Sequence, residues 1–187
     1  MPDPERVTQA LRRLREKGAV TKYLRLQSQV RETNVARDFD FQRSFNGYYK
    51  VRYRSQEWRR TFYEIFEASK AGSPGVGFRA VLANLHRRTT NYEASFSSKL
   101  VASLDPSAPV WDSRLMAYWG LRAPNQQHKA RLEAFVEVYE MLRNLMAGLL
   151  ASSGGQTIIA QFDKEFSSEA KHVSDMKKAD LVLWQIA

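Results

Sequence analysis

The chain contains no cysteine, and this absence excludes several kinds of chemistry at once. Disulfides, thiolate zinc sites, iron–sulfur clusters and thiol catalysis all require cysteine. A cysteine-free composition also suits a reducing compartment, so we expect a cytoplasmic protein.

Long apolar runs are also missing. A membrane-spanning helix needs about 20 apolar residues, and the longest apolar helix candidate, Leu142–Leu150, is interrupted by Arg143 and Asn144. The first eighteen residues, MPDPERVTQALRRLREKG, are charged throughout and lack the apolar core of a signal peptide. We therefore expect no membrane partner.

Signatures of nucleotide, hydrolase and metal sites are absent as well. The sequence has no Gly-Lys-Ser/Thr loop for phosphates, and Ser95–Ser98 lacks a nucleophile-elbow pattern. His86, His128 and His172 are isolated, without a carboxylate at metal-ligand spacing. We expect neither a metal site nor an organic cofactor.

What the sequence does contain is positive charge. It has 29 Lys and Arg against 20 Asp and Glu, which gives a net charge of +9. Such an excess attracts polyanions, because binding releases their condensed counterions. We expect a nucleic acid, and DNA in particular, as the partner.

Apolar residues recur at helical spacing along the whole chain, which predicts an all-α fold. The 187 residues are expected to form a single compact domain, 1–187, of about eight or nine helices, with 1–33 as a possible N-terminal helical extension. Expected N-caps, which begin helices, are Asp3, Thr21, Ser55, Asp112 and Ser174.

Two segments interrupt this pattern. Tyr48–Arg54 alternates as a β-strand does, although no partner strand is evident nearby. The strongest helical face runs from Leu132 to Leu149, and Ser152–Gly155 is expected to end that helix. This face suits packing inside the domain or across a dimer, and its spacing does not decide between them.

The segment Ala94–Leu115 carries the most chemical information. A helix containing Lys99 ends at Asp105-Pro106, an extended Pro109-Val110-Trp111 follows, and Asp112 opens the next helix. This order resembles the helix-hairpin-helix DNA glycosylase superfamily. The resemblance implies a helix-hairpin-helix-like fold in which Lys99 attacks the sugar C1′ and Asp112 orients or activates the nucleophile.

Both roles are chemically reasonable. A lysine must lose a proton to act as a nucleophile, so it needs burial or a cationic neighbour. A carboxylate at a helix N-terminus stays ionised and can act as a base. In the alternative interpretation, Asp112 is only an N-cap and Lys99 only a packing or surface residue.

The hairpin that should precede the lysine helix has two candidates. The family carries a Gly-x-Gly pattern there, whose backbone N–H groups hold a phosphate. Thr89–Glu93 has the right position but no glycine, whereas Pro74–Gly77 has the glycines but lies far before Asp112. The spacing from Lys99 to Asp112 is also short for the family.

A cluster rich in aromatic and basic residues spans Tyr48 to Arg60. Arginine and lysine suit phosphates, and aromatic rings can stack on unpaired bases. Alternatively, the aromatics are core and the cations a solvated face; Trp58 shares a helix side with Phe62 and so belongs to the core. The predicted nucleic-acid contacts are Lys50, Arg52, Arg54, Arg59, Arg60 and, beside Asp112, Arg114.

Two functions therefore fit the sequence. The first is a DNA-binding protein that resembles helix-hairpin-helix glycosylases and excises damaged or modified bases. The second is a non-catalytic basic helical module that binds nucleic acid or a protein partner.

Overall fold

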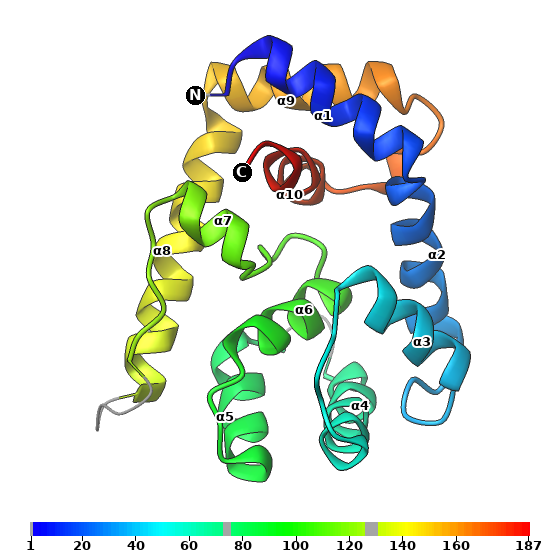
Figure 1. Ribbon diagram of the computed structural model, residues 1–187, viewed down its shortest axis with the longest axis vertical. Helices are drawn as coiled ribbons and strands as arrows, with labels where there is room; N and C mark the ends of the chain where they lie inside the picture. The colour runs from blue at the N-terminus through cyan, green and yellow to red at the C-terminus, as the bar shows by residue number, and fades with distance from the viewer. Residues whose placement is uncertain (1, 73–75, 126–130) are drawn as a thin grey trace.

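The computed structural model describes residues 2–72, 76–125 and 131–187, and over these residues the fold is all-α, as predicted (Figure 1). The described chain forms ten α-helices, one 3-10 turn and no strand. In chain order the elements are α1 (Pro4–Glu16), α2 (Ala19–Glu32), α3 (Phe39–Tyr48), α4 (Gln56–Lys70), α5 (Phe78–Thr89), α6 (Ala94–Leu104), α7 (Ser113–Tyr118), α8 (Arg131–Ala151), α9 (Ser153–Glu165), η1 (Ala170–His172) and α10 (Asp175–Ile186).

Side-chain caps fix several helix starts where the sequence predicts them. Asp3, Ser55, Asp112 and Ser174 each accept a hydrogen bond from a backbone N–H in the first turn of the following helix. Such caps satisfy backbone donors that have no partner within the helix. These four predictions are confirmed.

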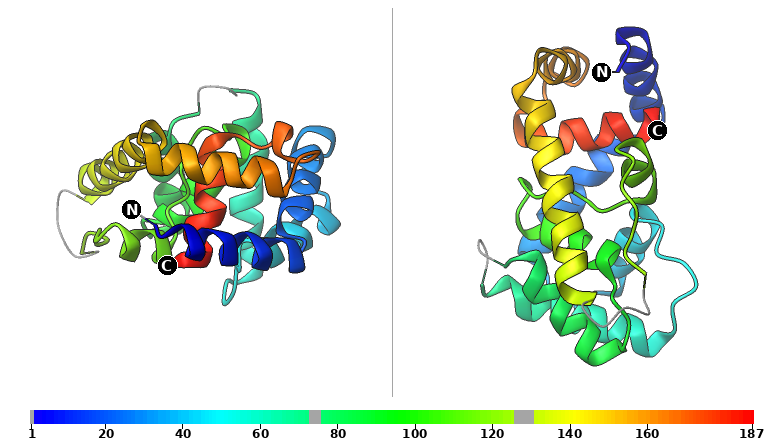
Figure 2. Two further views of the ribbon diagram at one scale, coloured as in Figure 1. Left: turned by 90° about the horizontal axis from the view of Figure 1, so that it is seen from above. Right: turned by 90° about the vertical axis from the view of Figure 1, so that its left-hand side faces the viewer.

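Two helices lie inside a frame made by the others. In Figures 1 and 2, α8 and α2 form opposite sides, α1 and α9 cross one end, and α4 and α5 form the other end. Helices α6 and α10 lie within this frame, and most of their residues are buried. No helix in the described ranges is long and apolar enough to cross a membrane.

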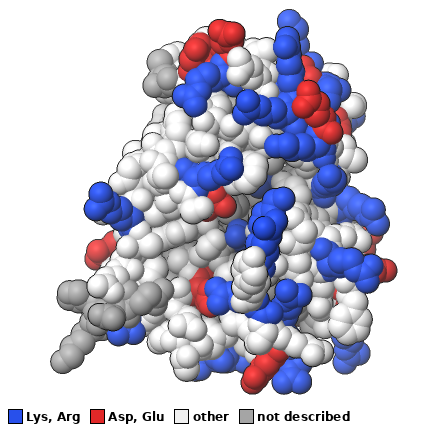
Figure 3. Space-filling model, viewed as in Figure 1, with Lys and Arg blue, Asp and Glu red and all other residues white. Residues whose placement is uncertain are grey.

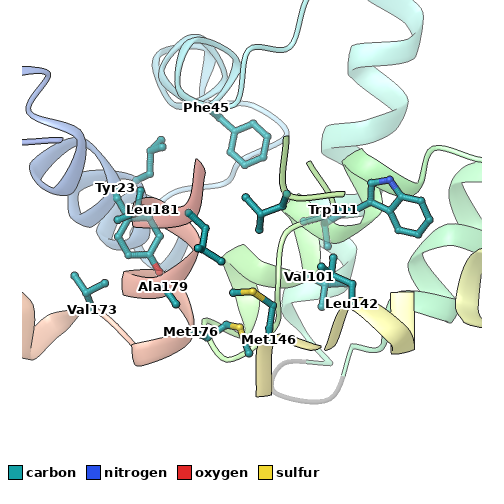
Figure 4. Close-up of a cluster of buried hydrophobic side chains, with 14 of the residues drawn as sticks. Tyr23, Phe45, Val101, Trp111, Leu142, Met146, Val173, Met176, Ala179 and Leu181 are labelled. Carbon is teal, nitrogen blue, oxygen red and sulfur yellow. The ribbon is translucent and has the colours of Figure 1, made fainter. Parts of the chain in front are cut away.

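The core joins segments that are far apart in the sequence. Tyr23 from α2, Phe45 from α3 and Leu181 from α10 belong to the same buried cluster as Trp111 and Met146 (Figure 4). Burial of so much apolar surface supplies the main driving force for this arrangement. It also leaves the polar side chains of α6 and α10 in a region with little water.

The predicted start of the second helix at Thr21 is wrong. The helix begins at Ala19, and Gly18 is its N-cap, with a φ of 57°. This left-handed conformation lets α2 follow α1 almost without a connecting segment, and glycine adopts it without steric cost.

The alternating segment Tyr48–Arg54 does not form a strand. Its first residue ends α3, and Lys50 and Tyr53 then both adopt a φ of 55°. Positive φ values break an extended conformation, so the chain turns twice before Ser55 caps α4.

The segment Ser152–Gly155 also differs from the prediction, because it begins a helix as well as ending one. Ser152 accepts a hydrogen bond from the Gly155 N–H at 3.1 Å and caps α9. A Cβ atom on Gly155 would lie 1.9 Å from the Leu149 carbonyl oxygen. Only glycine allows α8 and α9 to approach this closely.

Candidate active site

Lys99 lies in the middle of α6, a helix that is buried on nearly every side. The residue is only 7% exposed. Its Nζ lies 5.1 Å from the centroid of the Phe96 ring and 5.9 Å from that of Tyr49. Aromatic faces attract a cation but do not replace the hydrogen bonds of water. Within the described part of the chain, Nζ has no hydrogen-bond or ion-pair partner.

This environment lowers the pKa of Lys99. Burial is the largest cause, because it disfavours the charged ammonium group. The Asp112 carboxylate partly opposes this effect and raises the pKa, whereas the neighbouring Lys177 ammonium lowers it further. A lysine that loses its proton more easily than usual is a better nucleophile.

Asp112 is placed by the short extended segment that precedes it. Its carboxylate accepts a hydrogen bond from the Arg114 N–H at 2.9 Å and so caps α7. Two hydrogen bonds fix the segment before Asp112. The Trp111 N–H donates to Ser98 Oγ at 2.8 Å, and the Tyr139 hydroxyl donates to the Pro109 carbonyl at 3.0 Å. Ser98 directly precedes Lys99, so this bond sets the position of Asp112 relative to the lysine.

Lys99 and Asp112 line the same cleft. Two adjoining cavities, of about 250 Å³ and about 500 Å³, are both bordered by Tyr49, Lys50, Lys99 and Asp112. Figure 3 shows Lys and Arg side chains around a hollow near the middle of the face seen in Figure 1. The two residues singled out by the glycosylase resemblance are therefore brought together, too far apart for an ion pair but facing a common space.

A buried ion pair forms another wall of this cleft. Lys177 Nζ lies 2.5 Å from Asp180 Oδ2, and both side chains are less than 10% exposed. Burial lowers the pKa of Lys177, but the Asp180 carboxylate, through its charge and its hydrogen bond, raises it well above its usual value. Lys177 therefore stays charged beside Lys99.

Three tyrosine rings surround the Lys177 ammonium group. Its Nζ lies 5.2 Å from the ring centroid of Tyr23 and 5.7 Å from those of Tyr48 and Tyr49. Burial raises the pKa of all three phenols, that of Tyr23 to about 12. These rings remain neutral at physiological pH. Tyr48 and Tyr49 thus contact the buried Lys177 and line the cleft, and they do not form an exposed stacking surface.

The candidate hairpin Thr89–Glu93 lies at the connection between α5 and α6. Thr90 adopts a φ of 61°, a conformation that glycine would adopt without strain. The buried Glu93 carboxylate at the end of the hairpin lies 2.8 Å from the Arg54 guanidinium group. Of the alternative hairpin, Pro74–Gly77, residues 73–75 lie outside the described ranges.

The predicted DNA-contacting arginines fall into two groups. Arg54 pairs with Glu93 and lies over the Trp58 and Phe96 rings, 4.9 Å from each centroid. Arg114 lies 4.5 Å from the Trp184 ring centroid and donates to the Trp184 carbonyl, which joins α7 to the end of α10. Both guanidinium groups are thus held by partners within the protein.

The remaining predicted contacts are more open. Lys50, Arg52 and Arg60 are exposed, and Arg59 is half-buried. Lys50 borders the cleft itself, whereas Arg52 and Arg59 line a neighbouring groove. Trp58 is buried and stacks on Phe62 with centroids 5.3 Å apart, as its shared helix side predicts.

Sequence reasoning missed the contribution of α10 to this site. Lys177 and Asp180 are one helical turn apart in a helix that is otherwise largely apolar. Two opposite charges at that spacing in an apolar helix are a sign of a buried pair, and this signal was available. Their position beside Lys99 was not, because it depends on packing between distant segments.

Comparison with known proteins adds no identification. No protein-family profile matches this chain, and neither the curated proteins nor the solved structures contain a match.

Proposed function

We propose that this protein binds DNA and uses Lys99 as a nucleophile at C1′ of a damaged or base-free nucleotide. One observation carries the proposal: Lys99, buried and without a hydrogen-bond partner in the described chain, shares a basic cleft with Asp112. A buried lysine without a partner is costly for stability, and such costs are typical of functional sites.

The cleft suits an extrahelical nucleotide. Besides Lys99, four lysines border its smaller cavity, against the carboxylates of Asp112 and Asp180; they are Lys17, Lys22, Lys50 and Lys177. This excess favours an anionic ligand such as a phosphodiester. Trp184 and Tyr49 provide aromatic walls in the same cavity, and enzymes that act on a base must accommodate it outside the helical stack.

The reaction at an abasic site follows from these groups. Neutral Lys99 Nζ attacks the C1′ aldehyde of the ring-opened sugar, a C–N bond forms, and loss of water gives an imine. When a base is still attached, the same attack breaks the N-glycosidic bond, and the base leaves with the bonding electrons and takes up a proton. Asp112 would accept the proton released from Nζ.

Borohydride trapping tests this proposal. Borohydride reduces the imine to a stable secondary amine, so wild-type protein should form a covalent complex with duplex DNA that contains an abasic site. Lys99→Ala should abolish the complex, whereas Lys22→Ala, which removes another lysine from the cleft, should retain most of it. Absence of trapping would refute the proposed role of Lys99 as a nucleophile, and absence of base release from a panel of lesions as well would refute any glycosylase activity.

The second candidate function is a non-catalytic nucleic-acid-binding module. The observation in its favour is that the exposed cations Arg52 and Arg60 do not border the cleft of Lys99 and Asp112. This function predicts DNA affinity that falls steeply with salt in wild type and in Lys99→Ala, without covalent trapping in either.

A further inference from the structure

A second groove opens beside the cleft. It encloses about 520 Å³ between α3, the turn after it and the start of α4. Gly47 and Lys50 border both the groove and the smaller cavity of the cleft, so the two spaces adjoin at these residues. A polymer bound in one could therefore extend into the other.

Among the residues that the structure describes, the groove is lined by cations and by no carboxylate. Its basic residues are Arg43, Lys50, Arg52 and Arg59. Of these, Arg43 alone has an ion pair within the described residues: Asp40 lies 3.3 Å away and both side chains are more than 80% exposed, so the pair contributes little. The Arg59 Nε is buried without a partner in the described chain. These charges are available to an anion.

Exposed aromatic rings accompany these charges. Phe39 lines the groove from the first position of α3 and is 75% exposed, and Tyr53 in the following turn is 98% exposed. Single exposed apolar side chains are common on protein surfaces, so what distinguishes these rings is their position beside unpaired cations. The turn is also strained, because Lys50 and Tyr53 both hold a φ of 55°. Backbone strain of this kind tends to occur at ligand-binding sites.

We propose that this groove binds an unpaired stretch of DNA that continues from the nucleotide held in the cleft. Bases would stack on Phe39, and phosphates would contact Arg43, Arg52 and Arg59. Exposed aromatic faces beside unpaired cations favour single strands, since the bases of a duplex are already stacked on one another. The inference rests on the proposed function for its choice of DNA as the polymer.

Binding of a short fluorescein-labelled oligothymidylate, followed by anisotropy at several salt concentrations, tests the groove. Phe39→Ala should weaken binding at least about fivefold, because stacking on one base is lost. Phe39→Trp should retain the affinity and Phe39→Leu should not, since leucine is apolar but has no aromatic face. Phe39 is exposed, so circular dichroism and the melting temperature should be the same for all three variants.

Charge is tested separately. Arg43→Gln/Arg52→Gln should reduce the slope of log affinity against log salt by about 1.4, because two phosphate contacts to a single strand are lost. The matched control, Lys164→Gln/Lys171→Gln, removes the same charge from exposed positions in α9 and η1. It should retain most of the wild-type slope of log affinity against log salt. Equal effects of the two double variants, or equal affinity for Phe39→Ala and wild type, would overturn the groove assignment.

The oligothymidylate contains no abasic site, so its binding does not depend on Lys99 chemistry. Phe39-dependent binding without borohydride trapping would refute the proposed function and support the groove. Trapping on abasic duplex without Phe39-dependent binding of the single strand would refute the groove alone.

Discussion

Lys99 and Lys177 lie near the same tyrosine ring: their Nζ atoms are 5.9 Å and 5.7 Å from the centroid of Tyr49. Only Lys177 has a carboxylate partner, Asp180, and it stays charged. Lys99 lacks such a partner, and burial first and repulsion by Lys177 second lower its pKa, so it loses a proton more easily. The site thus combines a permanent cation with a lysine suited to nucleophilic attack.

The buried pair should set the pH at which Lys99 becomes reactive. Lys177→Met removes a charge that lowers the pKa of Lys99 and frees Asp180, which raises it. The midpoint of trapping rate against pH should therefore move to higher pH. Asp180→Asn removes a carboxylate that raises this pKa, so its midpoint should move to lower pH.

Both variants break the same ion pair and should destabilise the fold by about 3–5 kcal/mol. Opposite shifts of the pH midpoint therefore cannot result from destabilisation. No shift in either variant would show that the pair does not act on Lys99, and a shift to higher pH in both would show that it acts mainly through the charge of Lys177, which Asp180 maintains.

Lys99 should reduce the stability of the folded state. Its folded pKa lies below the unfolded value near 10.5, so the penalty is complete below the folded pKa and disappears as the pH rises towards 10.5. Lys99→Met should raise the melting temperature near neutral pH by a few degrees, since 1 kcal/mol corresponds to about 2–4 °C for a chain of this size. The gain should shrink at alkaline pH. A lower melting temperature would instead identify Lys99 as a packing residue.

Asp112 can be tested without losing the helix cap. Asparagine is as good an N-cap as aspartate, so Asp112→Asn should change stability by less than about 0.5 kcal/mol. The trapping rate at its pH plateau should fall by about a hundredfold, because the proton acceptor is lost. Loss of the carboxylate should also move the midpoint to lower pH. An unchanged plateau would leave Asp112 with a capping role only.

Arg54 and Arg52 should respond differently although both belong to the predicted DNA-contacting cluster. Arg54→Ala leaves the buried Glu93 carboxylate without its partner and should cost about 3 kcal/mol of unfolding free energy. Arg52 is exposed, so Arg52→Ala should change stability by less than about 0.5 kcal/mol while weakening DNA binding. Urea denaturation and anisotropy distinguish them, and equal stability losses would contradict this assignment.

Much of the fold could be predicted because its signals are local. Apolar spacing and the caps Asp3, Ser55 and Ser174 act within one or two helical turns. The errors arose where backbone conformation depends on packing or on unusual φ values, as at Gly18 and in the Lys50–Tyr53 turn.

The candidate site was only partly predictable for the same reason. Lys99 and Asp112 belong to one continuous segment, so a local pattern could identify both. The sequence does not indicate that Arg54 pairs with Glu93. Lys177 lies beside Lys99 only because α10 packs inside the frame formed by the other helices. Long-range packing therefore decides which cations are free to contact a ligand.

Identification of the trapped residue tests the central claim most directly. Wild-type protein reduced with borohydride on abasic DNA can be digested with nuclease and protease, and the modified peptide mapped by mass spectrometry. The mass of the reduced sugar fragment should be found on Lys99, with Lys17, Lys22, Lys50 and Lys177 unmodified. An adduct on one of those other cleft lysines instead of Lys99, or no adduct at all, would contradict the proposed role of Lys99.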